Sequence, residues 1–240
     1  MRDKIDLLIQ KLRLLDITIS EKQTEQFLIF YEMIINKNKV MNLTSVTEAV
    51  EVMDKHFVDS LAVKRIYDLN RKVSVIDVGT GAGFPGIPLK IVFPEIHIVL
   101  LDSLNKRVQF LKDVVRALGL ENVECIHGRS EDIGRIDEYR EKFDLCLSRA
   151  VASLSVLSEL CIPFVKIGGR FISYKAGNSA EEIEDAKNAV KKLGGKVRRT
   201  EQFLLPGTEL ERVFVEIEKV KETEKKYPRR AGIPERIPLK

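Results

Sequence analysis

The sequence predicts an α/β fold: a mostly parallel, seven-stranded sheet with an antiparallel hairpin at its edge, preceded by helices. Residues 73–78 are a β-branched run that passes through a glycine-rich turn into an apolar helical segment. Strand and helix patterns then alternate as far as residue 193, which is typical of a parallel sheet with crossover helices. The last two apolar runs, 196–203 and 212–219, lie close enough in the chain to pair as a hairpin.

The glycine-rich turn carries Gly79, Gly81 and Gly83 at alternate positions, and Pro85 then opens the helical segment. Glycine permits backbone conformations that other residues rarely adopt, and it leaves no Cβ between the main chain and a ligand. Proline suits the first turn of a helix, whose free amides favour an anionic or polar ligand. We therefore expect a cofactor at this turn, the alternative being a tight turn that binds nothing.

Two acids help to identify the cofactor. Asp77 completes an acid-x-Gly-x-Gly-x-Gly pattern, which is similar to the S-adenosylmethionine loop of Rossmann-like methyltransferases. Asp102 ends the next apolar run about twenty residues after the loop, the spacing that places a carboxylate on ribose hydroxyls. The glycines 81, 83 and 86 also match the dinucleotide fingerprint, so an NAD-dependent oxidoreductase stays open at this point. Such an enzyme would usually continue into a separate substrate domain, and no part of this chain fits one.

Composition limits the class of protein. The chain has 240 residues, 44% of them hydrophobic and 32% charged, which suits an ordinary globular protein. It contains no apolar stretch near the length needed to span a bilayer, and its three cysteines form no C-x-x-C pair. We expect a cytoplasmic monomer. Its chain should consist of helices over 1–70, a core over 71–220 and a basic arm over 221–240.

The N-terminal extension reads as three helices. Ser20 and Gln23 form a capping box at the start of the second helix, and a polar loop is expected over 36–45. The third helix, over about 50–63, carries His56 and is expected to cover the mouth of the cofactor site.

The carboxyl ends of the predicted strands gather the candidate ligand-binding residues. Strands are expected at 73–78, 96–102, 123–127, 143–148, 169–175, 196–203 and 212–219, and core helices at 85–92, 104–118, 154–165 and 180–193. Ligands of open α/β sheets lie outside the carboxyl ends of the strands. Besides the glycine turn and Asp102, these ends bear Ser130 with Glu131 and Ser148 with Arg149. Glu131 is either a partner of the adenine edge or a carboxylate favoured by a helix N-terminus.

Other reactive side chains suggest no chemistry. Cys146 lies inside the apolar run 145–147 and not beyond its end, so we expect core packing and not a nucleophile. The histidines His56, His97 and His127 lack the spacing of metal ligands. We therefore predict neither a cysteine nucleophile nor a metal site.

Several stretches carry a family resemblance that covers nearly the whole chain. They are residues 77–89 (DVGTGAGFPGIPL), 101–107, 128–131, 148–150 and 41–44, His56 with Asp59 and Ser60, and 228–234. Together they resemble the glucose-inhibited division protein B family, the bacterial rRNA small subunit methyltransferase G. The resemblance implies methyl transfer from S-adenosylmethionine to N7 of a guanine in 16S rRNA, with the small ribosomal subunit or its rRNA as partner. It also implies cofactor contacts from Gly79, Gly81, Gly83, Phe84, Asp102, Ser103, Leu104, Ser130, Glu131 and Arg149. Many relatives have Ala-Glu at the position of Ser130 and Glu131, which affects side-chain detail and not the backbone contact.

The implied chemistry requires no catalytic base. Guanine N7 carries a lone pair and no proton, so rate must come from alignment and desolvation. The N7 edge lies in the major groove, which is too deep and narrow to read in A-form RNA, so the target guanine must lie in a loop or an opened region. A nucleotide-sensing RNA-binding protein without catalysis is the alternative of another class.

The last twenty residues carry seven Lys or Arg and three Glu, a surplus of +4 that equals the net charge of the whole chain. Three prolines there favour an extended arm over a helix. We expect Arg229, Arg230 and Arg236 of this arm, with Lys175, to contact RNA; a solvated tail is the alternative. Truncation before Pro228 is then expected to leave cofactor binding near normal.

Overall fold

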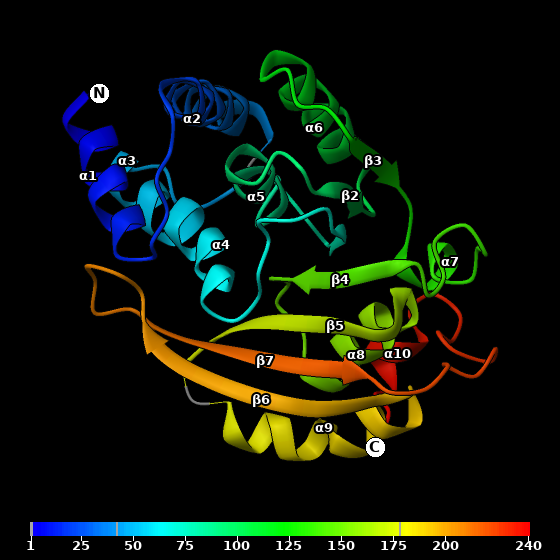
Figure 1. Ribbon diagram of the computed structural model, residues 1–240. Helices are drawn as coiled ribbons and strands as arrows, with labels where there is room; N and C mark the ends of the chain where they lie inside the picture. Colours follow the sequence, from blue (N-terminus) through cyan, green and yellow to red (C-terminus); the bar gives the residue numbers. More distant parts are fainter. Residues whose placement is uncertain (1, 42, 178) are drawn as a thin grey trace.

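A computed structural model describes residues 2–41, 43–177 and 179–240. Its single seven-stranded sheet has the order β3-β2-β1-β4-β5-β7-β6 (Figure 1). The strands are β1 (Ser74–Val78), β2 (His97–Asp102), β3 (Val123–His127), β4 (Phe143–Ser148), β5 (Val165–Ala176), β6 (Gly195–Leu204) and β7 (Glu211–Lys219). Strands β1 to β5 are parallel, and β7 runs antiparallel between β5 and β6. The predicted fold class, including the hairpin at the edge, is confirmed.

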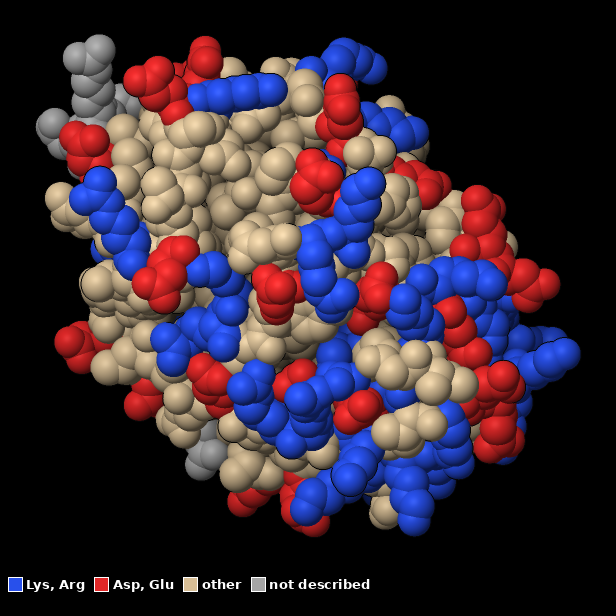
Figure 2. All heavy atoms as spheres, viewed as in Figure 1, with Lys and Arg blue, Asp and Glu red and all other residues tan. Residues whose placement is uncertain are grey.

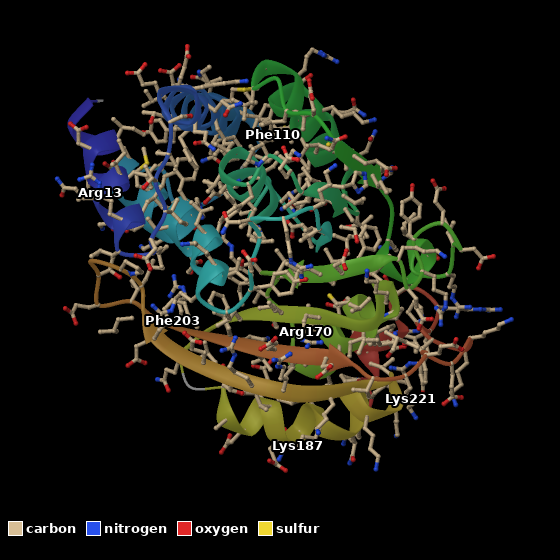
Figure 3. All side chains as sticks on the ribbon, in the orientation of Figure 1. Arg13, Phe110, Arg170, Lys187, Phe203 and Lys221 are labelled. Carbon is tan, nitrogen blue, oxygen red and sulfur yellow. The ribbon has the colours of Figure 1, made fainter. Side chains whose placement is uncertain are left out.

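Helices cover both faces of this sheet. On one face lie α2 (Glu21–Met41), α4 (Asp59–Leu61), α5 (Gly86–Val92) and α6 (Asn105–Ala117); on the other lie α8 (Leu154–Cys161) and α9 (Ala180–Lys192) (Figure 1). Successive strand residues point to opposite faces, so in β1 Val75 joins the first core and Ile76 the second. In α9, Ala186 faces the sheet while Lys187 points away from the protein (Figure 3). In the described ranges, no helix combines the length and apolar character needed to cross a membrane.

The N-terminal helices belong to the first core. After α1 (Arg2–Arg13) and α2, the segment α3 (Ala49–Val52), the π-helical turn η1 (Met53–Val58), α4 and the 3-10 turn η2 (Ala62–Arg65) form one continuous helical stretch. Phe27, Phe30 and Phe57 are fully buried with residues of β1 and β2. The first 70 residues therefore share one apolar core with the sheet.

The capping box at the start of α2 is confirmed. The Ser20 amide donates to Gln23 Oε1 at 2.8 Å, and the Gln23 amide donates to Ser20 Oγ at 3.2 Å. The prediction that a polar loop starts at residue 36 is wrong, because α2 continues to Met41. Lysine is a good helix former, and Lys39 Nζ donates to Asn36 Oδ1 one turn earlier, so this polar run favours helix. Asn42 of the 41–44 motif lies outside the described residues.

The region between β4 and β5 also differs from expectation. The helix expected to reach residue 165 ends at Cys161, and the 3-10 turn η3 (Ile162–Phe164) follows it. Pro163 cannot donate a helical hydrogen bond, which explains the early end. Strand β5 begins four residues earlier than expected, since Val165 already pairs with Phe143 of β4.

The expected extended C-terminal arm is wrong. Tyr227 and Pro228 are buried, and a short helix, α10 (Ile233–Arg236), follows them beside α8 (Figure 1). The physical reason is a salt bridge: Arg229 pairs with Glu159 of α8, which is fully buried. A charge run that finds a buried partner folds back on the core.

Candidate functional site

The glycine turn has the conformation that its glycines predict. Gly79, Gly81 and Gly83 have φ angles of +73°, +62° and +103°, a region that favours glycine. A Cβ on Gly83 would lie 2.6 Å from Ile87 Cγ1, so this glycine allows the turn to pack on α5. A Cβ on Gly81 would meet nothing within 4 Å. The open side of Gly81 therefore leaves space for a ligand against the backbone.

Asp77 stabilises this turn through a hydrogen bond to the main chain of α5. Its side chain is fully buried, and Oδ2 accepts a hydrogen bond from the Gly86 amide at 2.9 Å. Burial raises the pKa of its carboxyl to about 7. Its other oxygen, Oδ1, has no hydrogen-bond partner among the described residues. Asp77 thus ties the end of β1 to the start of α5 and positions the turn.

Asp102 lies at the carboxyl end of β2, where the ribose contact was expected. Oδ2 accepts from the Gly81 amide and Oδ1 from the Leu104 amide, both at 2.9 Å. Arg107 Nη1 lies 3.6 Å from Oδ2. A carboxylate offers about four acceptor positions, so each oxygen retains capacity for a hydroxyl. The hydrogen bonds from the two amides fix the orientation of the carboxylate toward those hydroxyls.

A cavity of about 220 Å³ opens beside Asp102. Five of the expected cofactor contacts line it, namely Gly79, Asp102, Ser103, Ser130 and Glu131, whereas Gly81, Gly83, Phe84, Leu104 and Arg149 do not. Ser130 Oγ donates to the Leu160 carbonyl, and Glu131 Oε1 accepts from the Gly232 amide at 2.9 Å. Pro234 and Glu235 also line the cavity, and neither was expected from the sequence as a cofactor contact. We call this space the donor cavity.

A second cavity, of about 620 Å³, shares Ala150 and Ala152 with the donor cavity. The other residues that surround it are Lys55, His56, Asp59, Arg149, Val151, Ser153, Tyr174, Lys175, Ala176, Glu182 and Arg212. They come from the π-helical turn, the start of α4, the segment after β4, the end of β5, the first turn of α9 and the start of β7. We call this space the acceptor cavity.

Arg149 lies at the centre of an ion network beside the acceptor cavity. Asp59 Oδ2 accepts from Arg149 Nη1 at 2.9 Å, and Asp59 Oδ1 accepts from Arg212 Nε at 2.7 Å. Arg149 Nη1 also donates to the Lys55 carbonyl at 2.8 Å. The guanidinium lies 5.2 Å from the centroid of the Phe84 ring, a cation–π contact. Both carboxylate oxygens of Asp59 are therefore occupied by arginines.

His56 lies in the same network as a neutral ring. It stacks on Phe84 with ring centroids 4.5 Å apart. Burial, with the adjacent Arg149 cation, lowers its pKa to about 3. Nδ1 lies 3.1 Å from both Arg149 Nη2 and the Lys55 carbonyl, and Nε2 lies 2.8 Å from Thr44 Oγ1. His56 has no free basic nitrogen at the cavity.

The family follows from comparison with known sequences. The family model of rRNA small subunit methyltransferase G matches residues 23–211. A protein of that name from Lachnoclostridium phytofermentans is 49% identical over 239 residues, which covers 100% of this chain and 98% of the relative. Another, from Exiguobacterium sp., is 48% identical over 96% of this chain and 97% of its own length. The chain belongs to this family. The predicted family and its S-adenosylmethionine-dependent methyltransferase chemistry are confirmed.

Solved structures show the same fold at low sequence identity. One is M. jannaschii TYW2 in complex with AdoMet, with a TM-score of 0.52, 21% identity, and coverage of 63% of this chain and 71% of that one. A SAM-dependent methyltransferase from Aquifex aeolicus has a TM-score of 0.51 and 20% identity, with 69% and 92% coverage. These likenesses agree with the Rossmann-like sheet of this family member.

Two of the four expected RNA contacts are held in ion pairs. Lys175 Nζ donates to Glu182 Oε1 at 2.7 Å and to the Ala152 carbonyl at 2.6 Å. Arg229 pairs with buried Glu159. Arg230 and Arg236 are exposed. Figure 2 shows Lys and Arg gathered on the lower half of the visible face, over β6, β7 and the C-terminal segment. Contact of these four residues with RNA stays a prediction.

The sequence missed several residues of this family member's site. Arg212 and Glu182 reach the acceptor cavity from β7 and α9, and nothing in their local patterns marks them. The family resemblance drew attention to His56 and Asp59, which also line this cavity. Cys146 is fully buried among apolar residues of the second core, and burial raises the pKa of its thiol. Its expected core packing is confirmed.

Proposed function

We propose that this chain transfers the methyl group of S-adenosylmethionine to N7 of a guanine in 16S rRNA, with the donor cavity for the cofactor and the acceptor cavity for the base. When bound, the cofactor supplies an electrophilic methyl group on a sulfonium. The two cavities share Ala150 and Ala152 at the carboxyl end of β4, the place where a donor and an acceptor would meet.

Three features support the fit of the cofactor. Asp102 retains acceptor positions for two ribose hydroxyls while two amides hold its orientation. Gly81 leaves open space where a Cβ would point. Leu157 and Leu160 give the donor cavity an apolar lining that suits a purine. We propose Gly79, Gly81, Asp102, Ser103, Ser130 and Glu131 as the residues that hold the cofactor.

The assignment of N7 as the methylated atom rests on the side chains of the acceptor cavity that could act as a general base. Asp59 is bound by two arginines, Glu182 by Lys175, and His56 Nδ1 by Arg149. Each of the two carboxylates and the imidazole that line this cavity among the described residues is held by a cationic side chain. An exocyclic amine or a C5 carbon loses a proton during methylation, but N7 does not. A cavity that aligns the base without a general base suits N7.

Four other expected contacts do not line the donor cavity, and we propose indirect roles for them. Phe84 supports Arg149 and His56 by ring contacts, and Arg149 shapes the acceptor cavity through Asp59. Gly83 allows close packing on α5. Leu104 offers its amide to Asp102 and so orients the carboxylate.

Methyl transfer with labelled S-adenosylmethionine to 16S rRNA and to small ribosomal subunits tests the proposal. The labelled RNA is digested to nucleosides, which are compared with 7-methylguanosine. We expect the label in that nucleoside alone. Label in another nucleoside contradicts the assignment.

We also propose that the protein works as a monomer in the cytoplasm. Its three cysteines are free and none is paired, which suits a reducing compartment. Light scattering at micromolar concentration tests the first point: a mass near 27.4 kDa is expected, and twice that mass would contradict it.

A further inference from the structure

The C-terminal turn lies against the donor cavity, although its sequence suggests a tail. Pro234 and Glu235 of α10 line this cavity together with Asp102 and Ser130. Pro234 is buried, whereas Glu235 is exposed at the rim. The short helix α10 thus lines this cavity together with residues of β2 and α8 that lie far from it in the sequence.

Two anchors fix α10 in this position. The Gly232 amide donates to Glu131 Oε1 at 2.9 Å, which ties the residue before α10 to the short helix α7 (Ser130–Ile133). Arg229 donates to both oxygens of Glu159, with Nε at 2.9 Å from Oε1 and Nη2 at 2.7 Å from Oε2. Arg229 Nη2 also donates to the Ile237 carbonyl at 2.8 Å. The same guanidinium therefore holds both ends of the loop that carries Pro234.

The segment before this loop is anchored as well. Arg140 donates to the Tyr227 carbonyl at 2.9 Å and to the Thr223 carbonyl at 2.7 Å, and Arg135 donates to the Pro228 carbonyl. Two arginines that follow α7 thus satisfy several main-chain acceptors between Thr223 and Pro228. Such bonds fix the path of the backbone as well as its attachment.

We propose that α10 is the outer wall of the adenine subsite, with the ring of Pro234 packed on the base opposite Leu157 and Leu160. This inference rests on the proposed function. Asp102 fixes the ribose end of the ligand, and the glycine turn lies on one side of it. Apolar side chains of α8, Leu157 and Leu160, line the same cavity as Pro234. A flat, apolar ring face suits this lining, and a charged amino acid group does not.

Glu131 gains a second role under this proposal. It was expected at the adenine edge, and one of its oxygens holds Gly232 instead. We assign it as a positioning residue that orients the wall. Because α10 lines the donor cavity, removal of the tail is expected to weaken cofactor binding. A free arm would leave cofactor binding near normal.

The test uses calorimetric binding of S-adenosylhomocysteine and of adenosine to the full chain. Pro234→Ala removes ring carbons but suits a helix, so α10 is retained. We expect its affinity to fall about tenfold for both ligands, because both contain the base, as expected when a hydrophobic contact is lost from a pocket. The matched control is Pro238→Ala, at an exposed proline four residues on, with unchanged affinity. Deletion of residues 233–240 keeps Arg229 and Gly232 and is expected to cause a larger loss.

The outcomes separate the two proposals. Wild-type affinity in Pro234→Ala, or a loss for S-adenosylhomocysteine without one for adenosine, overturns the adenine wall while the methyltransferase assignment stands. Equal loss in Pro234→Ala and Pro238→Ala points to a general effect of the tail and also overturns the wall. If the wild-type chain binds neither S-adenosylhomocysteine nor S-adenosylmethionine, the proposed function fails instead.

Discussion

Arg229→Ala tests whether the C-terminal segment is part of the folded core. Glu159 is fully buried, and its carboxylate accepts from the Arg229 guanidinium and from the Arg229 amide at 2.7 Å. Loss of the guanidinium leaves a buried charge with a single amide donor, and breaking such a pair costs about 3–5 kcal/mol. In a chain of this size, 1 kcal/mol shifts the melting temperature by about 2–4 °C, so the expected drop is about 6–20 °C.

Thermal unfolding without ligand measures this drop, and the neighbouring residue gives a control. Arg230 is exposed, so Arg230→Ala is expected to change the unfolding free energy by less than about 0.5 kcal/mol. Replacing both Arg229 and Glu159 with leucine removes the uncompensated charge and is expected to recover most of the stability. A melting temperature for Arg229→Ala within about 2 °C of wild type would refute the buried pair and return the arm to solvent.

Three further perturbations test the site. Gly81→Val places a β-branched residue at a φ of +62°, so we expect about 1–2 kcal/mol of lost stability in a folded protein and a collapse of S-adenosylmethionine affinity by calorimetry. Burial lowers the pKa of His56 from 6.5 to about 3, so the stability contributed by this histidine is full above pH 6.5 and falls by about 1.4 kcal/mol per pH unit between 6.5 and 3, a slope that His56→Gln should remove in urea titrations. If Arg230 and Arg236 each bind a phosphate, replacing either with alanine lowers the salt slope of RNA binding by about 0.7–0.9.

Each of these expectations has a contrary result. Normal cofactor affinity in a folded Gly81→Val protein would place the ligand away from the turn. A pH dependence of stability between 5 and 6.5 that His56→Gln leaves unchanged would show that other groups cause it. Salt slopes equal to wild type in both arginine variants would remove the C-terminal segment from the RNA interface.

Local sequence patterns predicted the elements well because the relevant forces are local. Strands β3 and β4 begin and end where their apolar runs do, at residues 123–127 and 143–148. Asp102 was expected at a strand end because the spacing to the glycine turn depends on one strand–helix–strand unit. The capping box of Ser20 was visible because both partners lie within four residues.

Long-range pairing was not visible in the sequence. Arg229 and Glu159 are 70 positions apart, and Arg212 and Asp59 are 153 apart. A charge run has the same composition whether water or a buried carboxylate surrounds it. The prolines of the tail were consistent with an extended arm, yet Pro234 lies in a short helix. Only the three-dimensional structure could show which cations have a buried partner.

Asp59 has a consequence for how this enzyme can be altered. It comes from the N-terminal helical stretch, while its partners are Arg149, which follows β4, and Arg212 of β7. A graft of the first 70 residues that lacks an acid at this position would leave two partly buried guanidinium groups without their counter-ion. The helical stretch can therefore be exchanged as a cassette only if its acid and the two arginines are kept together. Changes of substrate preference in such a protein must proceed by coordinated substitutions across distant parts of the chain.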